Sequence, residues 1–163
     1  MSYAATLSSG LARSANMLEH HLADFSDADM LVRPVPRANH AAWQVAHLVE
    51  FIGQVARCVA PDANVTPTPA LARAALRESA ASDDPALFVP KAALIAQLRA
   101  VTEALVGALA RLRDADLSMP TPAEFQTFAP TLGHLLMTVP MHASMHLGQV
   151  QVIRRALGKP NLF

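Results

Sequence analysis

The spacing of apolar residues constrains the fold of this chain more than any other feature. Apolar side chains recur every three or four positions over four separate segments, residues 7–25, 39–61, 90–112 and 131–158. This recurrence has the period of an amphipathic α-helix, and no segment alternates with the period of two that is typical of a half-buried β-strand. The pattern predicts an all-α fold, an up-down four-helix bundle that forms one domain over residues 1–163.

Helix ends follow from the residues that flank these segments. Asn39 is the predicted N-cap of the second helix, and Thr131 is the predicted N-cap of the last. Gly158, with Pro160 just beyond it, predicts the end of the last helix. Pro140 lies inside that helix and removes one backbone hydrogen bond, so it either bends the helix or divides it into two pieces.

Two connections are long. Residues 61–69 are rich in proline and residues 70–81 are rich in alanine, which predicts a loop and a short helix that form a crossover connection. Residues 114–130 hold Met119, Phe125 and Phe128 among three prolines. These side chains either pin the loop to the bundle or cover a ligand cavity.

The composition is apolar for a small bundle. Hydrophobic residues make up 52% of the chain and charged residues only 16%, compared with about 25% charged residues in an average domain. This surplus predicts either an unusually apolar outer face or, as we expect, an outer face that is partly buried in a homodimer. Gly148, in the last helix, predicts a close approach by another helix, within the chain or across the dimer.

Charge and targeting features exclude several classes of protein. Thirteen basic and thirteen acidic residues balance. The one basic cluster, formed by Arg154, Arg155 and Lys159, is explained by its place at a helix C-terminus, so we expect no nucleic-acid partner. No apolar run approaches the ~20 residues of a membrane span, and we expect no membrane partner. The single cysteine, Cys58, is interpreted as a small core residue, and with no secretory signal the expected compartment is the cytoplasm.

The histidines carry the chemical information. His142 and His146 are four positions apart, which places their Cβ atoms about 5–6 Å apart on one helix face. His47 lies between Trp43 and Phe51 at the same spacing. We therefore predict that His47, His142 and His146 bind one metal ion between two helices. The alternative is that these are core histidines that only form hydrogen bonds.

Two stretches resemble the signatures of a known family. The second helix contains WQVAHL at residues 43–48, and the last helix contains HASMHLGQ at residues 142–149, then IRR and the ending LGKP. Both resemble motifs of the DinB-like superfamily of metal-binding bundles. The resemblance implies a DinB-like four-helix bundle, often dimeric, whose three motif histidines hold a divalent metal. It also implies an activity like that of metal-dependent transferases and isomerases, which act on a small electrophile with a low-molecular-weight thiol such as bacillithiol, mycothiol or glutathione.

Three histidines leave an open position on a metal, which is typical of a catalytic site. Zinc or nickel is the first expectation, and iron, manganese and copper are alternatives. The open position suits a thiolate for transfer or isomerisation, or water for hydrolysis. The alternative function is a non-catalytic metal-binding or dimerisation bundle with a stress-related or metal-responsive role.

Further polar residues are candidates around the three ligands. Glu50 is either a base beside the ion or a solvated residue, and Gln149 either orients an imidazole or is a core amide. His21 is a candidate fourth ligand or substrate contact, with a role unrelated to metal as the alternative. His134 is too far along the last helix to share the ion. His40 is expected to line the mouth of the site or to face water.

Overall fold

The computed structural model describes residues 2–62 and 65–162 of the chain. Four long helices form the bundle, and their bounds are α1 (Tyr3–Leu22), α2 (Ala41–Val59), α4 (Lys91–Leu109) and α5 (Leu132–Ala156). A short helix, α3, and four 3₁₀ turns lie in the connections, with the bounds α3 (Pro69–Ala74), η1 (Asp29–Leu31), η2 (Glu78–Ala81), η3 (Pro85–Leu87) and η4 (Asp114–Ser118). No β-strand occurs in these described ranges, and the predicted all-α fold is confirmed.

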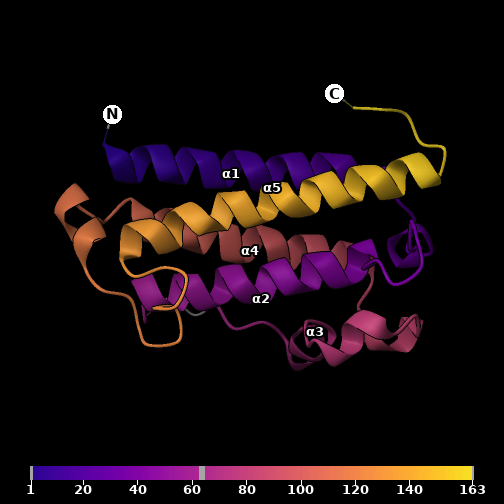
Figure 1. The fold of residues 1–163 in the computed structure, drawn as a ribbon, viewed down its shortest axis with the longest axis horizontal. Helices are drawn as coiled ribbons and strands as arrows, with labels where there is room; N and C mark the ends of the chain where they lie inside the picture. The colour runs from indigo at the N-terminus through magenta and orange to yellow at the C-terminus, as the bar shows by residue number, and fades with distance from the viewer. Residues whose placement is uncertain (1, 63–64, 163) are drawn as a thin grey trace.

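The crossover determines the direction of the helices. Residues 65–90 travel back along the outside of the bundle, so α2 and α4 run in the same direction while α1 and α5 run in the other (Figure 1). The contacts agree: the end of α5 meets the end of α1, where Arg154 donates to the carbonyl of His21. The start of α4 also meets the end of α1, since Lys91 donates to the carbonyl of Phe25. As a result, α2 and α5 lie side by side and antiparallel.

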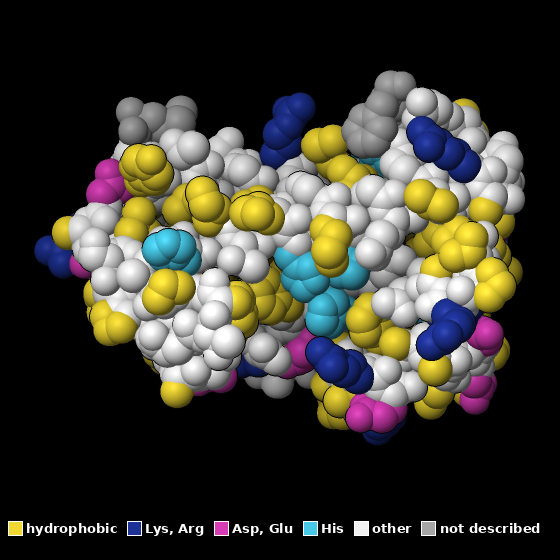
Figure 2. Space-filling view, viewed as in Figure 1, with side chains coloured by type: hydrophobic (Ala, Val, Ile, Leu, Met, Phe, Trp, Pro, Cys, Tyr) yellow, Lys and Arg dark blue, Asp and Glu magenta, His cyan; other side chains and the backbone are white. Residues whose placement is uncertain are grey.

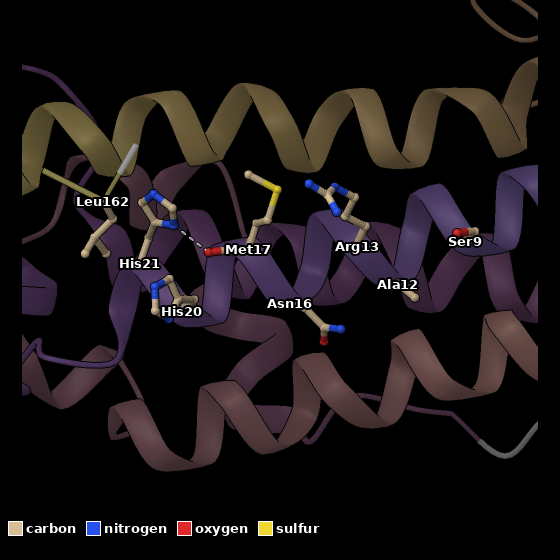
Figure 3. A pocket seen from close by; sticks show the side chains of 8 residues that line it. All are labelled: Ser9, Ala12, Arg13, Asn16, Met17, His20, His21 and Leu162. Carbon is tan, nitrogen blue, oxygen red and sulfur yellow. Dashed lines mark hydrogen bonds between the residues drawn. The ribbon is translucent and has the colours of Figure 1, made fainter.

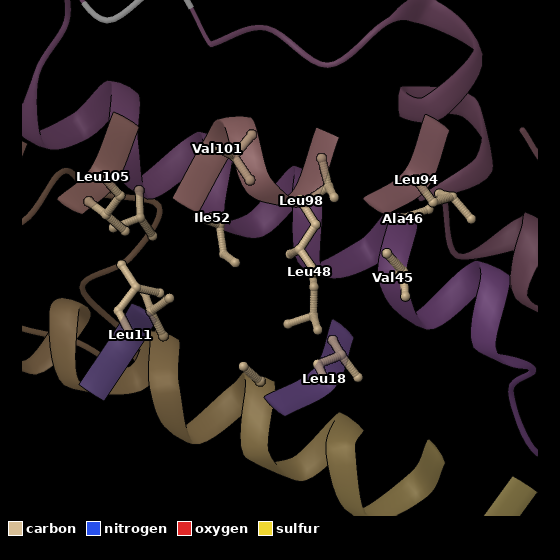
Figure 4. Close-up of a cluster of buried hydrophobic side chains, with 14 of the residues drawn as sticks. Leu11, Leu18, Val45, Ala46, Leu48, Ile52, Leu94, Leu98, Val101 and Leu105 are labelled. Atoms are coloured by element: carbon tan, nitrogen blue, oxygen red, sulfur yellow. The ribbon is translucent and has the colours of Figure 1, made fainter. Parts of the chain in front are cut away.

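The core consists of the apolar faces that the periodicity indicates. Figure 4 shows leucine, valine and isoleucine side chains from α1, α2 and α4 pointing toward one another. Leu11, Ile52 and Leu105 are examples, each with at most 1% of its surface exposed. Burying one such side chain stabilises the fold by about 1.5–3 kcal/mol. Because this core holds α2 and α5 in place, it also sets the positions of the three candidate ligands.

The N-cap of α2 differs from the prediction. It is His40, whose Nδ1 accepts the backbone N–H of Trp43 at 3.2 Å, and not Asn39. The proton of His40 therefore lies on Nε2, which donates to the carbonyl of Ser82 at 3.1 Å. Burial lowers the pKa of His40, so the ring is neutral in this role. His40 is completely buried, and the expectation that it lines the mouth or faces water is wrong.

The last helix runs without interruption through Pro140, so the alternative of two separate pieces is excluded. Thr131 is its N-cap residue, although the hydroxyl contacts His134 and makes no capping hydrogen bond. The helix ends where predicted, because Gly158 adopts a φ of 67°, a left-handed conformation that glycine tolerates best. This conformation lets the backbone N–H of Lys159 close on the carbonyl of Arg154.

Arg154 has a structural role that its place in the basic cluster did not reveal. Its side chain is 1% exposed and joins α5 to the end of α1. The guanidinium donates to Asp24 Oδ1 at 2.5 Å, to the His21 carbonyl at 2.7 Å and to the Pro160 carbonyl at 2.9 Å. The hydrogen bond from Arg154 holds the pKa of Asp24 below its ordinary value.

The two long connections are anchored by buried apolar residues. Leu71 and Ala74 of α3 are fully buried against the bundle. The predicted short helix is present as α3 over the first part of residues 70–81, and residues 61–62 and 65–68 lie outside any helix as predicted, whereas residues 63–64 of the predicted loop lie outside the described residues. In the second connection Phe125 is buried, whereas Met119 and Phe128 are exposed. Phe125 alone among these three therefore pins the loop to the bundle core.

One stretch, Pro85–Leu109, is long and apolar enough to cross a membrane by length and composition, with a mean hydropathy of 1.5. The sequence analysis expected no such stretch. Most of it is α4, which packs on α1 and α2 with Leu94, Leu98 and Leu105 buried. Some of the apolar residues of this stretch are thus the ones that α4 contributes to the bundle core.

Candidate metal centre

Three histidines meet where α2 faces α5. His47 projects from α2, and His142 and His146 project from adjacent turns of α5. One ligand nitrogen from each lies within 4.8 Å of the others. His146 is buried, whereas His47 and His142 are partly exposed, so the cluster is open to solvent on one side. Figure 2 shows histidine side chains grouped at the surface in the middle of this face, with cationic and acidic side chains beside them.

A hydrogen bond to Gln149 selects the tautomer of His146. The Nδ1 atom of His146 lies 2.9 Å from the Gln149 side-chain oxygen, to which it donates, so the Nε2 atom carries a lone pair. The Nε2 atom of His142 lies 3.0 Å from that atom. The Nε2–H tautomer of His142 donates a hydrogen bond to this lone pair, whereas in the other tautomer the two Nε2 lone pairs can face one cation. Gln149 thus contacts the ring of His146 as an orienting residue would, and its role toward a metal stays a prediction.

Aromatic side chains hold the other two rings. Trp43 stacks on His47 with ring centroids 4.9 Å apart and planes 6° apart. Phe51 meets His142 edge to face at 5.0 Å. The indole N–H of Trp43 donates to the carbonyl of Leu76 at 2.9 Å, which ties this ring to the crossover. These contacts restrict the imidazoles to orientations that converge.

The electrostatics keep the imidazoles neutral. Burial, together with the charge of neighbouring histidines, lowers the pKa of His142 to about 4 and that of His146 to about 4. Burial, and then the charge of Arg77, lowers the pKa of His47. Neutral imidazole nitrogens are the form that binds metal. The three residues thus fit a divalent metal ion that accepts imidazole ligands.

These shifts predict how the stability of the metal-free protein depends on pH. In the unfolded chain a histidine titrates near its ordinary pKa of about 6.5. Between this value and about 4 the unfolded chain binds protons that folded His142 and His146 do not. The free energy of unfolding is therefore expected to fall as the pH drops through this window, and this contribution levels off below it.

Thermal unfolding of the metal-free protein between pH 7.5 and pH 4 checks this expectation. A variant with both His142→Gln and His146→Gln should lose less stability on acidification, because glutamine does not titrate. Parallel curves for the parent and the double variant would show that these two groups do not carry the effect.

A cleft of about 520 Å³ adjoins the exposed side of His47. Trp43, Glu50 and Phe51 of α2 line one wall, and Leu76 and Arg77 of the crossover line the other. Glu50 belongs to this cleft and not to the group of convergent ligands. Its carboxylate accepts from Gln54 at 3.0 Å and pairs with Arg57 at 3.5 Å. Among the three histidines, His47 is the one that lines this cleft.

The remaining histidines lie elsewhere. His21 is not brought to the cluster, so it is not a fourth ligand there: its Nδ1 donates to the Met17 carbonyl at 2.7 Å, as Figure 3 shows. It lines a separate, open hollow on α1 with His20 and Arg13. His134 is exposed and contacts Thr131 at 2.7 Å, away from the ion position as predicted.

Cys58 is half-buried against the core. Burial, and then the charge of Glu124, raises the pKa of its thiol. A raised pKa means less thiolate at neutral pH and a less reactive cysteine. Cys58 thus fits the predicted role of a small packing residue.

Comparison with known proteins decides the classification. The family model of the DinB superfamily matches residues 11–150. This chain belongs to the DinB superfamily. Among solved structures, the DinB-superfamily bundle is similar to a conserved protein from Enterococcus faecalis, with 19% identity, a TM-score of 0.73 and coverage of 98% of this chain and 99% of that one. At this level of identity the likeness shows the fold. The curated proteins contain no match to this chain.

Sequence reasoning missed the crossover wall of the site. Leu76 and Arg77 have no periodic pattern that could place them, because they follow the end of α3. The spacing predicted that Trp43 lies on the same helix face as His47, and the structure adds that its ring stacks on His47 and that its indole N–H contacts the crossover. The alanine-rich composition of α3 predicted a helix there but carried no information about which helix of the bundle it covers.

Proposed function

We propose that this DinB-superfamily protein is a divalent-metal enzyme that uses a low-molecular-weight thiol to transfer or isomerise a small electrophilic substrate. The observation that carries the proposal is the convergence of three neutral histidines beside an open cleft. A buried structural zinc site is usually closed by four protein ligands, whereas a catalytic site keeps a position for a small molecule. Zinc or nickel is the metal that we propose first.

A divalent ion held by His47, His142 and His146 would lower the pKa of a thiol brought to it and so supply a thiolate at neutral pH. The chain contributes the positions of the rings and of the substrate. Gln149 fixes the ring of His146, and Trp43 fixes the ring of His47. Trp43, Phe51 and Leu76 give the cleft apolar walls for the carbon skeleton of a substrate.

The test is a coupling reaction between a thiol and an activated aryl halide. In this reaction a sulfur–carbon bond forms, the halide leaves with its bonding electrons and the thiol proton passes to solvent. We expect zinc- or nickel-loaded protein to accelerate the reaction with bacillithiol, mycothiol or glutathione. The metal-free protein and His142→Ala should not accelerate it, and His134→Ala, on the same helix but outside the cluster, should behave as the parent does.

A loaded protein that binds metal but accelerates no thiol reaction would favour the alternative, a non-catalytic metal-binding bundle with a stress-related or metal-responsive role. Acceleration of ester hydrolysis without thiol would instead favour activation of water at the same site.

We also propose that the outer face of α5 is covered by a second copy of this chain. Met137, Met141, Met145 and Val152 are exposed along one face of the helix. Gly148 lies on the same face, and a Cβ placed there would meet nothing within 4 Å. No helix of the described chain therefore makes the close approach that Gly148 predicts. In this proposal a helix of the second copy packs against Gly148. A continuous apolar face of this kind is typical of homodimer interfaces.

The glutamate substitution Met141→Glu is expected to dissociate this dimer, because it places a charge at the centre of an apolar interface. A central contact of this kind is worth about 2 kcal/mol or more, so the dissociation constant should rise by at least about 30-fold. Sedimentation equilibrium measures it directly. Val35→Glu, at a similarly exposed apolar residue in a loop, is the matched control. A monomeric parent, or equal effects of the two substitutions, would contradict the proposal.

A further inference from the structure

The cleft beside the histidines has two walls of different origin. The α2 wall is part of the rigid bundle, while the facing wall comes from the crossover, at Ala72, Ala75, Leu76 and Arg77. Its volume of about 520 Å³ is within the range of about 300–1,000 Å³ that is usual for small-molecule sites. Most of the lining is apolar, so the few polar groups in it determine which molecules fit.

Arg77 is the unpaired charge of this cleft. Its side chain is exposed, and in residues 2–62 and 65–162 its guanidinium has no hydrogen-bond or ion-pair partner. It lies close enough to His47 that its positive charge lowers the pKa of that ring, although burial lowers this pKa more. By contrast, Arg57 neutralises Glu50, the acidic residue of the opposite wall. The remaining charge of the cleft is therefore positive.

We propose that the Arg77 guanidinium is an anion subsite that selects small organic ligands carrying a carboxylate, with their apolar part held between Trp43, Phe51 and Leu76. A guanidinium binds a carboxylate through two parallel N–H···O hydrogen bonds, which fix orientation as well as charge. The planar indole of Trp43 is anchored to the crossover backbone at Leu76, so the subsite and the apolar wall keep a constant separation. Together with the proposed function, this assigns carboxylate-bearing thiols or electrophiles as the substrate class.

The sole tryptophan of the chain makes the subsite measurable without metal. Trp43 is that residue, and it lines the cleft, so its fluorescence reports on a bound molecule. Metal-free protein is titrated with 3-phenylpropionate and with 3-phenylpropionamide, which have nearly the same shape but differ in charge. We expect the carboxylate to bind about tenfold more tightly, the effect of one partly exposed charged hydrogen-bonded pair.

Substitutions assign the effect to Arg77. Arg77→Met should abolish the preference for the carboxylate while leaving binding of the amide unchanged, and Arg77→Lys should keep part of it. Arg73→Met is the matched control, since Arg73 is an exposed arginine of α3 that does not line the cleft. Equal binding of the two probes by the parent, or a preference that survives in Arg77→Met, would overturn the proposal.

A second titration separates this inference from the proposed function. Cobalt-loaded protein is titrated with 3-mercaptopropionate and 3-mercaptopropionamide, and the visible absorption of cobalt reports the thiol. Discrimination that depends on Arg77 in both titrations supports the subsite and the thiol site together. If the fluorescence preference is present but cobalt gives no thiol signal, the subsite stands and the thiol function fails. If cobalt responds equally to both thiols in the parent and in Arg77→Met, the thiol function stands and the subsite fails.

Discussion

Replacing His146 with alanine is expected to remove metal binding and the stability that metal confers. His146 is the most buried of the three candidate ligands and the only one whose ring is fixed by a hydrogen bond to Gln149. Loss of an orienting partner alone typically weakens metal binding by about 10- to 100-fold, so loss of the ligand should exceed about 100-fold. Metal content of untagged protein, measured by mass spectrometry after zinc or nickel loading, gives the direct comparison.

Stability gives a second, independent measure of the same site. Metal that binds only the folded state at about 1,000 times its dissociation constant adds about 4 kcal/mol, which is about 10 °C in the melting temperature of a domain of this size. A chelator should therefore lower the melting temperature of the loaded parent by about this amount. It should leave His146→Ala unchanged.

Two further variants are expected to lose less metal binding than His146→Ala. Gln149→Ala should show an intermediate loss of affinity, about 10- to 100-fold, because the ring of His146 remains but is no longer oriented. His134→Ala should retain full metal content, because His134 lies outside the cluster. A parent that binds neither zinc nor nickel would contradict the metal-enzyme proposal and leave a helical bundle with histidines in its wall.

Arg154→Met is expected to cost about 2–4 kcal/mol of unfolding free energy. Methionine keeps the aliphatic part of the side chain but removes the charged donor to the carbonyls of His21 and Pro160, and a hydrogen bond to a charged group contributes about 1.5–3 kcal/mol. Asp24 adds less to the loss because its side chain is 46% exposed and water can solvate it. Urea unfolding at pH 7 measures the change.

Arg155→Met is the matched control for this substitution. Arg155 is the next residue of the same helix turn but is exposed, so its replacement should change the stability by no more than about 0.5 kcal/mol. Equal losses in the two variants would mean that the buried network does not join α1 to α5 as the contacts indicate.

The helices and the three candidate ligands could be predicted because both follow from local spacing. A helix repeats every 3.6 residues, so four-residue spacing places His142 with His146, and Trp43 with His47, wherever the bundle lies in space. Which helices become neighbours depends on packing, and the length of the connection between α2 and α4 gave only the presence of a crossover. The same limit applies to Arg154, whose partners at the end of α1 are remote in sequence.

Residue preferences also do not decide which of two neighbouring residues takes a position in the fold, because that choice depends on the surrounding contacts. Asn39 is the better N-cap by preference, yet His40 takes the position because a buried neutral imidazole there satisfies Trp43 on one side and Ser82 on the other. Gly148 indicated a close contact that the described chain does not make. Such residues depend on what surrounds them, and spacing carries no information about surroundings.

The route of the α2–α4 connection has an evolutionary consequence. The three histidines belong to helices that the core holds, whereas the wall facing them belongs to a connecting segment of which Leu71 and Ala74 are part of the buried core and Val65, Ala75, Phe88 and Val89 pack partly buried against it. Insertions and substitutions in residues 65–90 can therefore accumulate without moving the histidines. Proteins that descend from a common ancestor with this fold can therefore keep one metal site. They can change which molecules the cleft accepts through changes in this one connecting segment.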